Sequence, residues 1–278
     1  MKKGLKNLLA IGLVALTGAA VLGCGAKGEA TENVDSLAAI KEKGKLVVGL
    51  SADYAPYEFH ILDENGKDQI VGFDVKIAEE IAKDMGVELE IKDMQFGTLI
   101  SAVPTGKIDL IISAMTPDAE RREAVDFSDI YYVAEQGIVV RAEDKDKYKN
   151  FEDLTGLKVG AQMGTIQADL AKDNIKDVEL QLLTGVNDLI LGLKSGKMEA
   201  LIVEVPVAEM IVKNNPELFL SEETIKDEEG GSAIAMKKDS PELAEQVNKS
   251  IKRILDEGLL DDFIIEANEL ATKEVKAE

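Results

Sequence analysis

The sequence predicts an α/β fold built from two similar lobes. Residues 106–113 read Gly-Lys-Ile-Asp-Leu-Ile-Ile-Ser and residues 196–203 read Gly-Lys-Met-Glu-Ala-Leu-Ile-Val, so a turn, an acid and an apolar run recur in both halves. Such apolar runs are typical of buried parallel strands. They alternate with helical patterns, which indicates parallel sheets. Because open α/β sheets bind ligands beyond the carboxyl ends of their strands, we expect the functional site in a cleft between the lobes.

The N-terminus has the pattern of an export signal. Three lysines within the first six residues precede an apolar stretch over residues 8–22, which is short for a membrane span of about 20 residues. The ending Val-Leu-Gly-Cys at Cys24 resembles a bacterial lipobox, whose cysteine is acylated; an ordinary signal peptide with an incidental cysteine is the alternative. We expect residues 1–23 to be a lipoprotein signal peptide, Cys24 to be lipidated, and residues 24–43 to be a tether.

Composition and motifs exclude several kinds of site. The chain has 32 basic and 53 acidic residues and a formal net charge of -21, whereas nucleic-acid binding needs a basic surface. This charge could attract cationic ligands, although a soluble acidic surface is the preferred interpretation. A single cysteine excludes an intrachain disulfide and a cysteine-based zinc site. No phosphate-binding glycine motif or calcium loop occurs, so no cofactor or metal is expected.

The first half begins with an apolar strand over residues 45–50 and a loop that contains Tyr54. A hairpin then turns at residues 63–66. Apolar residues at every fourth position from Phe73 to Met85 predict an amphipathic helix, and Gly86 is expected to end it. A strand, a short helix and another strand follow at residues 87–94, 98–103 and 108–113.

The second half repeats this order and is followed by two closing helices. We expect two crossings between the lobes, near Val133–Gly137 and near residues 228–231, where paired glycines can absorb large dihedral changes. One lobe, residues 135–231, is then inserted into the other, residues 44–134 and 232–270. The expected elements are a helical turn at 151–154, strands at 157–161, 179–183 and 198–203, and helices at 166–172, 186–194, 205–213, 241–255 and 260–270.

Residues 113–128 are the sharpest candidate for a ligand site. The segment opens at the end of a strand and runs into an expected helix start at Thr116–Pro117, where free N–H groups and the helix dipole favour an anion. Arg121 follows at a spacing that could return its guanidinium to the same point and hold a carboxylate with two parallel hydrogen bonds. From spacing alone, however, a solvated helix arginine is the preferred interpretation for both Arg121 and Arg122.

Several stretches in the same order carry a resemblance to a known family. They are residues 45–49, 54–59, 71–75, 106–110 and 116–128, the last with a distinctive Glu-Arg-Arg and Val-Asp-Phe-Ser core. From Leu46 to about Phe263 the chain resembles the polar-amino-acid-binding proteins of bacterial ABC importers, solute-binding family 3. The resemblance implies a type II periplasmic-binding-protein-like fold, in which two α/β lobes joined by two crossing strands close over the ligand.

The same resemblance assigns roles at the amino-acid backbone of the ligand. It implies that Arg121 clamps the ligand α-carboxylate, helped by backbone at Ala114 and Thr116, by the Thr116 hydroxyl, and by Thr165 from the second lobe. Glu204 ends the repeated strand, where the family usually has an aspartate that receives the ligand ammonium. Glutamate is one methylene longer, and a solvated acid at a helix start is the alternative for it.

The resemblance also implies a pocket for the ligand side chain, formed by Ser51, Tyr54, Phe96 and Gln162. Tyr54 and Phe96 match positions where aromatic faces sandwich the ligand, and such faces attract cations. Members that bind basic amino acids often have an aspartate where Ser51 stands. Glu58 could supply the negative charge instead. Basic and neutral polar ligands both stay open, with a slight preference for basic.

The sequence therefore predicts a lipoprotein on the extracytoplasmic face of the cell membrane. It would capture a polar amino acid and deliver it to an ABC permease and its ATPase, as a monomer and with membrane contact through the lipid anchor only. An amino-acid sensor or adhesin is one alternative. The other is an enzyme similar to the cyclohexadienyl dehydratases, for which Glu58 and Glu204 are the only obvious acid–base candidates; no enzymatic activity is expected.

Overall fold

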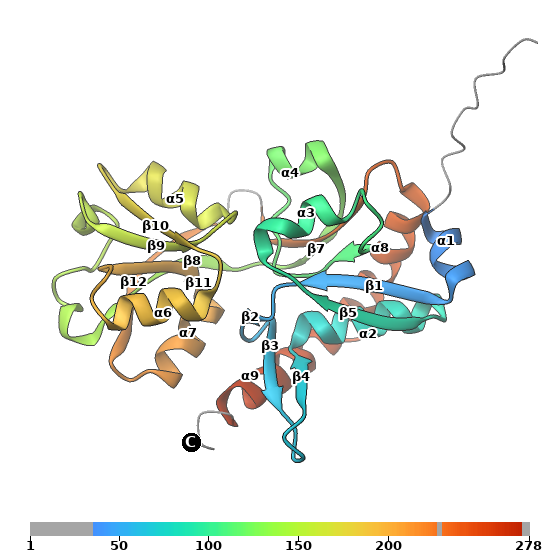
Figure 1. Ribbon diagram of the computed structural model, residues 1–278, viewed down its shortest axis with the longest axis horizontal. Helices are drawn as coiled ribbons and strands as arrows, with labels where there is room; N and C mark the ends of the chain where they lie inside the picture. The colour runs from blue at the N-terminus through green and yellow to red at the C-terminus, as the bar shows by residue number, and fades with distance from the viewer. Residues whose placement is uncertain (1–35, 227–229, 274–278) are drawn as a thin grey trace, which may run out of the picture. The chain divides into compact units, whose positions relative to one another are not determined.

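The computed structural model describes residues 36–226 and 230–273. The expected signal peptide, Cys24 and most of the expected tether lie outside these residues, as does part of the second expected crossing. The described residues contain two five-stranded sheets and one three-stranded sheet (Figure 1). None of the helices in this part of the chain combines the length and the apolar character that a bilayer span requires. It also contains no group of three or more His, Cys, Asp or Glu side chains suited to a metal ion.

The first sheet has the strand order β5-β1-β6-β13-β7. Its strands β1, β5 and β6 are parallel, so their carboxyl ends lie at one edge. At that edge the N–H of Ser51 donates to the Ser113 hydroxyl at 3.1 Å. The strands are β1 (Lys45–Leu50), β5 (Glu88–Asp93), β6 (Leu110–Ile111), β7 (Val125–Tyr132) and β13 (Ser232–Lys237), the last antiparallel to β6 and β7.

The second sheet has the order β10-β9-β11-β8-β12 and repeats the plan of the first. The near-repeats at residues 106–113 and 196–203 both lead into the middle strand, β6 in the first sheet and β11 in the second. The expected two-lobed α/β fold is thus confirmed. The strands are β8 (Glu135–Arg141), β9 (Lys158–Gln162), β10 (Glu179–Leu183), β11 (Ala200–Glu204) and β12 (Leu218–Lys226), with β8 antiparallel to β11 and β12.

The chain passes between these sheets twice. It leaves the first sheet after β7 and enters the second at β8, then returns between β12 and β13. The two crossings were predicted from the sequence, but the four strands next to them, β7, β8, β12 and β13, were not. In β7 and β12, buried and exposed positions mix without a strict alternation, whereas β8 and β13 are short runs of buried residues. The lobe boundaries at residues 134/135 and 231/232 stay a prediction.

Helices cover both faces of the first sheet. Leu46 and Val48 of β1 belong to the apolar cluster of α2 and α8, whereas Val47 packs on the other face with residues of η1 and α3. The α2 helix has the predicted bounds, and Gly86 ends it in the left-handed conformation, φ 73°. The helices of this lobe are α1 (Ser36–Lys43), α2 (Phe73–Met85), η1 (Phe96–Thr98), α3 (Leu99–Ala102), α4 (Ala119–Ala124), α8 (Pro241–Asp256) and α9 (Leu259–Lys273).

The second sheet is covered in the same manner. Leu201 and Val203 of β11 pack with residues of α6 and α7, while Ala200 and Ile202 face the cluster that includes α5. This alternation places the end of β11 between the two helical layers. The helices here are η2 (Ala142–Asp144), η3 (Glu152–Leu154), α5 (Ile166–Asn174), α6 (Val186–Lys194) and α7 (Val205–Asn214).

The third sheet is the predicted hairpin with one added strand. It pairs β2 (Asp53–Tyr54) with β3 (Glu58–Leu62), and β3 with β4 (Asp68–Val71). The structure differs from expectation in α1, which falls within the range expected to be a tether. Its Ile40 is buried in the core of the first lobe. The hydrophobic gain from that burial explains why residues 36–43 are ordered as a helix.

Candidate ligand-binding site

A cavity lies where β1 and β6 of the first sheet and β9 of the second reach their carboxyl ends. Together with the open space at its mouth, its empty volume is about 330 Å³. All the ligand-binding residues predicted from the sequence line it, with the exception of Glu204. The lining consists of the predicted Ser51, Tyr54, Phe96, Ala114, Thr116, Arg121, Gln162 and Thr165, together with Glu58, Ser113, Ile166 and Gln167.

Arg121 is held in place from several sides. Its Nη1 donates to the Thr116 carbonyl at 2.7 Å and its Nη2 to the Gly164 carbonyl of the other lobe at 3.0 Å. Its Nε lies 3.1 Å from an Asp118 carboxylate oxygen. The guanidinium carbon lies 5.4 Å from the centre of the Phe96 ring. The face of Phe96 that was expected to meet the ligand is therefore adjacent to Arg121.

Arg122, the alternative candidate for the carboxylate clamp, makes its contacts outside the cavity. Its Nε donates to the Pro117 carbonyl at 2.7 Å, and its guanidinium lies over the Phe127 ring. It does not line the cavity. The position of Arg121, rather than Arg122, fits a carboxylate clamp.

The helix expected to start at Thr116–Pro117 starts later, at Ala119. Asp118 is its N-cap residue, and the Asp118 carboxylate accepts a hydrogen bond from the Arg121 N–H at 2.8 Å. A side-chain cap satisfies the donors at a helix start. A protein carboxylate therefore occupies the helix end that was expected to receive an anion.

Ala114 is one of the residues whose backbone was expected to contact the ligand. It has a φ of 47°, which is uncommon for a residue other than glycine. Its N–H donates to a carboxylate oxygen of Asp74 at 2.9 Å. That N–H is therefore hydrogen-bonded within the protein, and contact between the Ala114 backbone and the ligand stays a prediction.

Glu204 is placed behind the cavity wall. It is 3% exposed, its carboxylate accepts a hydrogen bond from the Tyr57 hydroxyl, and its N–H donates to the Tyr54 hydroxyl at 3.2 Å. Burial and the nearby Glu204 carboxylate raise the pKa of both tyrosines well above the ordinary value. The longer glutamate side chain thus reaches the aromatic residues of the other lobe. Its role as receptor of the ligand ammonium is not supported by this placement and stays a prediction.

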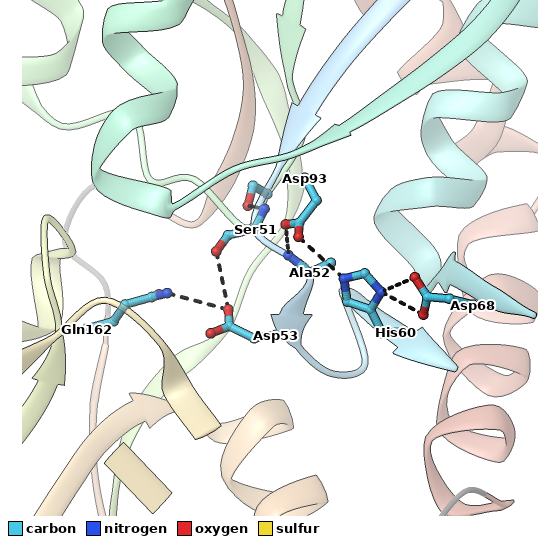
Figure 2. A network of polar contacts seen from close by, with 8 residues as sticks. Ser51, Ala52, Asp53, His60, Asp68, Asp93 and Gln162 are labelled. Atoms are coloured by element: carbon cyan, nitrogen blue, oxygen red, sulfur yellow. Dashed lines mark hydrogen bonds and ion pairs between the residues drawn. The ribbon is translucent and has the colours of Figure 1, made fainter. Parts of the chain in front are cut away.

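Asp53 connects the two lobes beside the cavity and was not predicted. Figure 2 shows its carboxylate between Ser51 and Gln162, at 3.2 and 3.5 Å from their polar atoms. Its other oxygen accepts the Val186 N–H, at the start of α6, at 2.7 Å. Burial raises the pKa of Asp53, and the hydrogen bonds partly oppose that effect. The sequence held no distinctive motif for this contact, because its partners come from distant segments.

His60 belongs to a separate network on the hairpin. Its Nδ1 lies 2.9 Å from Asp68 and its Nε2 lies 3.4 Å from Asp93, whose carboxylate also accepts the Ala52 N–H (Figure 2). Burial lowers the pKa of His60, but the hydrogen bonds to both aspartates outweigh this and raise it. His60 is exposed and does not line the cavity.

Glu58 and Asp74 form a buried acid pair at the cavity. Glu58 lines the cavity and accepts a hydrogen bond from the Ser113 hydroxyl, while Asp74 accepts hydrogen bonds from Ala114 and from the Tyr131 hydroxyl. Burial, followed by the charge of Asp74, raises the pKa of Glu58 well above its ordinary value. Burial also raises the pKa of Asp74 to about 6.

Comparison with known proteins identifies the family. The model for bacterial extracellular solute-binding proteins, family 3, matches residues 46–265. The chain is 39% identical over 246 residues to the arginine-binding extracellular protein ArtP of Bacillus subtilis, covering 87% of this chain and 90% of ArtP. It is 33% identical to a probable histidine-binding protein of Campylobacter jejuni, covering 94% of this chain and 98% of that protein.

A solved structure shows the same fold with a ligand. The amino acid ABC transporter substrate-binding protein AbpA of Streptococcus pneumoniae, bound to L-arginine, is similar with a TM-score of 0.82 and 42% identity. The similarity covers 84% of this chain and 99% of AbpA. These relatives are binding proteins rather than enzymes, and AbpA is the substrate-binding protein of an amino acid ABC transporter. The chain therefore belongs to the bacterial extracellular solute-binding proteins of family 3.

Proposed function

We propose that this protein captures an amino acid with a cationic side chain, arginine before others, in the cavity between its lobes. The observation that carries the proposal is that the lining of one cavity includes both a basic group, the Arg121 guanidinium, and an acidic group, the buried Glu58 carboxyl group. Such a lining complements a ligand that has a carboxylate at one end and a cation at the other. An enclosed site strengthens both interactions, because water no longer screens the charges.

The carboxylate end is formed by Arg121 and the start of α5. A guanidinium can hold a carboxylate with two parallel hydrogen bonds. Thr165 is the N-cap residue of α5, and the cavity is also lined by Ile166 and Gln167 of its first turn. The N-terminus of a helix favours an anion through its dipole and its backbone N–H groups. Both lobes would then contribute to the same ligand carboxylate.

The cationic end is formed by Glu58 and the ring of Tyr54. Ser51 stands where an aspartate would be expected for a basic ligand, but Glu58 supplies an acid on the same lining. The aromatic ring adds a cation–π surface. The arginine-binding protein ArtP and the arginine-bound AbpA, both similar along most of the chain, support the same ligand class.

Ligand capture would stabilise the closed arrangement of the lobes. Contacts already join them around the cavity, from Arg121 to the Gly164 carbonyl and from Asp53 to the Val186 N–H. A ligand that touches both lobes binds the closed state better than the open one, and it shifts the equilibrium by that difference in affinity. The lobes would be residues 44–134 with 232–270, and residues 135–231.

A thermal-shift screen tests the ligand class. Protein lacking residues 1–24 would be unfolded, refolded to remove bound ligand, and mixed with each of the common amino acids, ornithine, citrulline and cystine. A ligand at 100 times its dissociation constant stabilises a protein by about 2.7 kcal/mol. We expect arginine, ornithine or lysine to raise the melting temperature. A response to glutamine, asparagine or cystine alone would contradict the cationic class, and no response at all would contradict amino-acid binding.

Membrane attachment and delivery complete the proposal. We propose that Cys24 carries the lipid after removal of residues 1–23, and that the monomeric protein hands its ligand to an ABC permease and its ATPase. Fractionation of cells that express wild type or Cys24→Ala tests the anchor, since the variant should leave the membrane fraction. Loss of arginine uptake on deletion of the protein, restored by wild type, tests delivery; unchanged uptake would favour a sensor or adhesin.

A further inference from the structure

Two buried carboxyl oxygens at the cavity have no hydrogen-bond partner: one belongs to Glu58, which lines the cavity, and the other to Asp74, which does not line it. Glu58 on β3 and Asp74 on α2 are both 0% exposed. Each has one oxygen with a donor, as described above. The other oxygen of each, Glu58 Oε2 and Asp74 Oδ1, has no hydrogen-bond partner. A buried polar atom without a partner is costly, and native structures contain few of them.

The two carboxyl groups are bound by neighbouring residues, since Glu58 accepts from the Ser113 hydroxyl and Asp74 accepts from the N–H of Ala114. A hydrogen bond between the two carboxyl groups also contributes to the pKa of each. Two ionised carboxylates cannot form this bond, because both are acceptors only. One proton between them supplies the missing donor, satisfies both oxygens and removes the repulsion between like charges in a region of low dielectric. The mutual hydrogen bond raises the pKa of Glu58 and lowers that of Asp74. These opposite effects agree with Glu58 as the donor and Asp74 as the ionised partner, and the hydrogen bonds that Asp74 accepts give the geometric reason.

Asp74 is the better placed of the two to stay ionised. Its Oδ2 accepts from the Ala114 N–H and from the Tyr131 hydroxyl, both at 2.9 Å. Glu58 accepts from Ser113 alone. A carboxylate that accepts more hydrogen bonds is stabilised in its charged form. The proton consequently resides on the member of the pair that lines the ligand cavity.

We propose that the Glu58–Asp74 pair carries one proton in the ligand-free protein, and that capture of an amino acid with a cationic side chain expels this proton. This inference rests on the proposed function. In the bound state the ligand cation replaces the proton as the group that neutralises Glu58. The O–H bond of Glu58 breaks, its electron pair stays on the carboxylate, and the proton passes to solvent buffer. Capture is thus an exchange of one cation for another.

The other charged and titratable groups around the pair do not replace it as the proton source. Burial raises the pKa of Tyr131 and Tyr54 well above the ordinary value, so these hydroxyls stay protonated near neutral pH. The guanidinium of Arg121 stays charged. The negative charge of Asp53 favours retention of a proton at Glu58 until a ligand cation arrives.

The exchange makes recognition of charge dependent on pH. As the pH rises, the proton on Glu58 competes less, so affinity for a cationic ligand increases. For a full proton released per ligand, the increase is tenfold per pH unit. A neutral ligand of the same shape, such as L-citrulline, displaces no proton and keeps a constant affinity. The ratio of the affinity for arginine to the affinity for citrulline therefore increases with pH, until the Glu58–Asp74 pair has lost its proton in the ligand-free protein.

Isothermal titration calorimetry tests the inference on the protein without residues 1–24. L-arginine is titrated at pH 7 in buffers of different ionisation enthalpy, and the slope of the observed enthalpy against that quantity counts the protons released. We expect a release of about one proton. Arginine binding with a slope of zero would overturn this inference and leave the proposed function intact. Absence of arginine binding in every buffer would overturn both.

Glu58→Gln is the matched control. Its amide can still donate to Asp74, so the pair stays hydrogen-bonded, but there is no proton to lose. We expect a folded variant that binds arginine more weakly, releases no proton and has an affinity independent of pH around neutrality. A variant that still releases a proton would contradict the assignment. If Glu58→Gln does not fold, Asp74→Asn serves instead: it removes the ionised carboxylate that favours the proton on Glu58 and should also reduce the release.

Discussion

At the scale of single residues, the protein itself holds the guanidinium of Arg121, the group proposed to bind the ligand carboxylate. Its guanidinium is held by the carbonyls of Thr116 and Gly164, by Asp118, and by the ring of Phe96. Its side chain is only 10% exposed. A group that is already immobilised loses little conformational freedom on binding, so more of the interaction energy appears as affinity.

We expect Arg121→Ala to reduce the affinity for arginine by about tenfold or more, because it removes a charge-assisted hydrogen bond to the ligand carboxylate. The fold should survive, since the side chain packs at the cavity rather than in the core. Calorimetric titration measures the loss, and circular dichroism checks the fold. Arg122→Ala is the control and should bind normally, because Arg122 points away from the cavity. The reverse pattern would move the clamp to Arg122.

Asp74 gives a prediction for stability. Its pKa is raised from 3.8 to about 6 in the folded protein. A raised pKa means that the folded state retains a proton that the unfolded state has released. This contribution to stability is present below the unfolded pKa and is lost as the pH rises through the folded pKa, at a cost of about 3 kcal/mol.

Asp74→Asn has no such proton to lose. Its stability relative to wild type should therefore increase as the pH rises from about 4 to about 6, and then level off. Urea unfolding of both proteins across this range gives the difference. A difference that is the same at every pH would show that the Asp74 carboxyl group is not buried in the way described here.

At the scale of elements, a hydrogen bond between β2 and α6 joins the two lobes. Asp53 at the start of β2 accepts the N–H of Val186, the first residue of α6. The helix has Gly185 as its N-cap residue, and Gly185 provides no side-chain hydrogen bond. The other lobe therefore supplies the carboxylate that a capping side chain would normally supply.

Asp53→Ala should weaken arginine binding by about tenfold, since a hydrogen bond to a charged group contributes about 1.5–3 kcal/mol and part of this is recovered by water. The loss arises from a less stable closed state and not from lost ligand contacts. Small-angle scattering should show a more extended ligand-free protein. A variant with weaker binding but an unchanged scattering profile would place Asp53 in the ligand site itself.

Elements also show which structures a sequence can predict. The α2 helix was predicted with its bounds because an apolar stripe and a terminal glycine both define it locally. The start of α4 was missed because the Asp118 side chain, rather than Pro117, sets it. The strands β7, β8, β12 and β13 were missed because their neighbours lie far away in the sequence, and because exposure in β7 and β12 has no regular period.

The candidate site also has a part that could be predicted from the sequence and a part that could not. Family resemblance predicted most of the cavity lining, since those residues lie in recognisable motifs. It did not predict that Glu204 turns toward Tyr57, because that depends on how the two lobes pack. The link between Glu58 and Asp74 was also missed. Each acid alone resembles a surface residue, and only the fold brings them together.

At the scale of the whole molecule, the two crossings of the chain touch each other. A Cβ atom added to Gly231 would lie 2.2 Å from the carbonyl oxygen of Tyr132, the last residue of β7. Gly231 has a φ of 118°, a conformation that other residues rarely adopt. The connection between the lobes is therefore packed closely on one side, where only glycine fits.

We expect Gly231→Ala to reduce both stability and arginine affinity, because a Cβ would push the crossings apart. Gly230→Ala is the matched control: it also has a positive φ, but nothing lies within 4 Å of its added Cβ. Thermal unfolding and calorimetry compare the two variants. Equal losses in both would assign the effect to the backbone dihedral alone and not to contact between the crossings.

The strand order also has a consequence for the synthesis of the chain. The second sheet is built from one uninterrupted stretch, β8 to β12, whereas the first has β13 between β6 and β7. Since β13 is translated after the whole second sheet, the first sheet stays divided until the ribosome has nearly finished. A chain cut or stopped before Ser232 would keep every strand of the second sheet but lose β13, the strand that joins β6 to β7 in the first. The first sheet, whose strands begin to be made before those of the second, is thus completed after it.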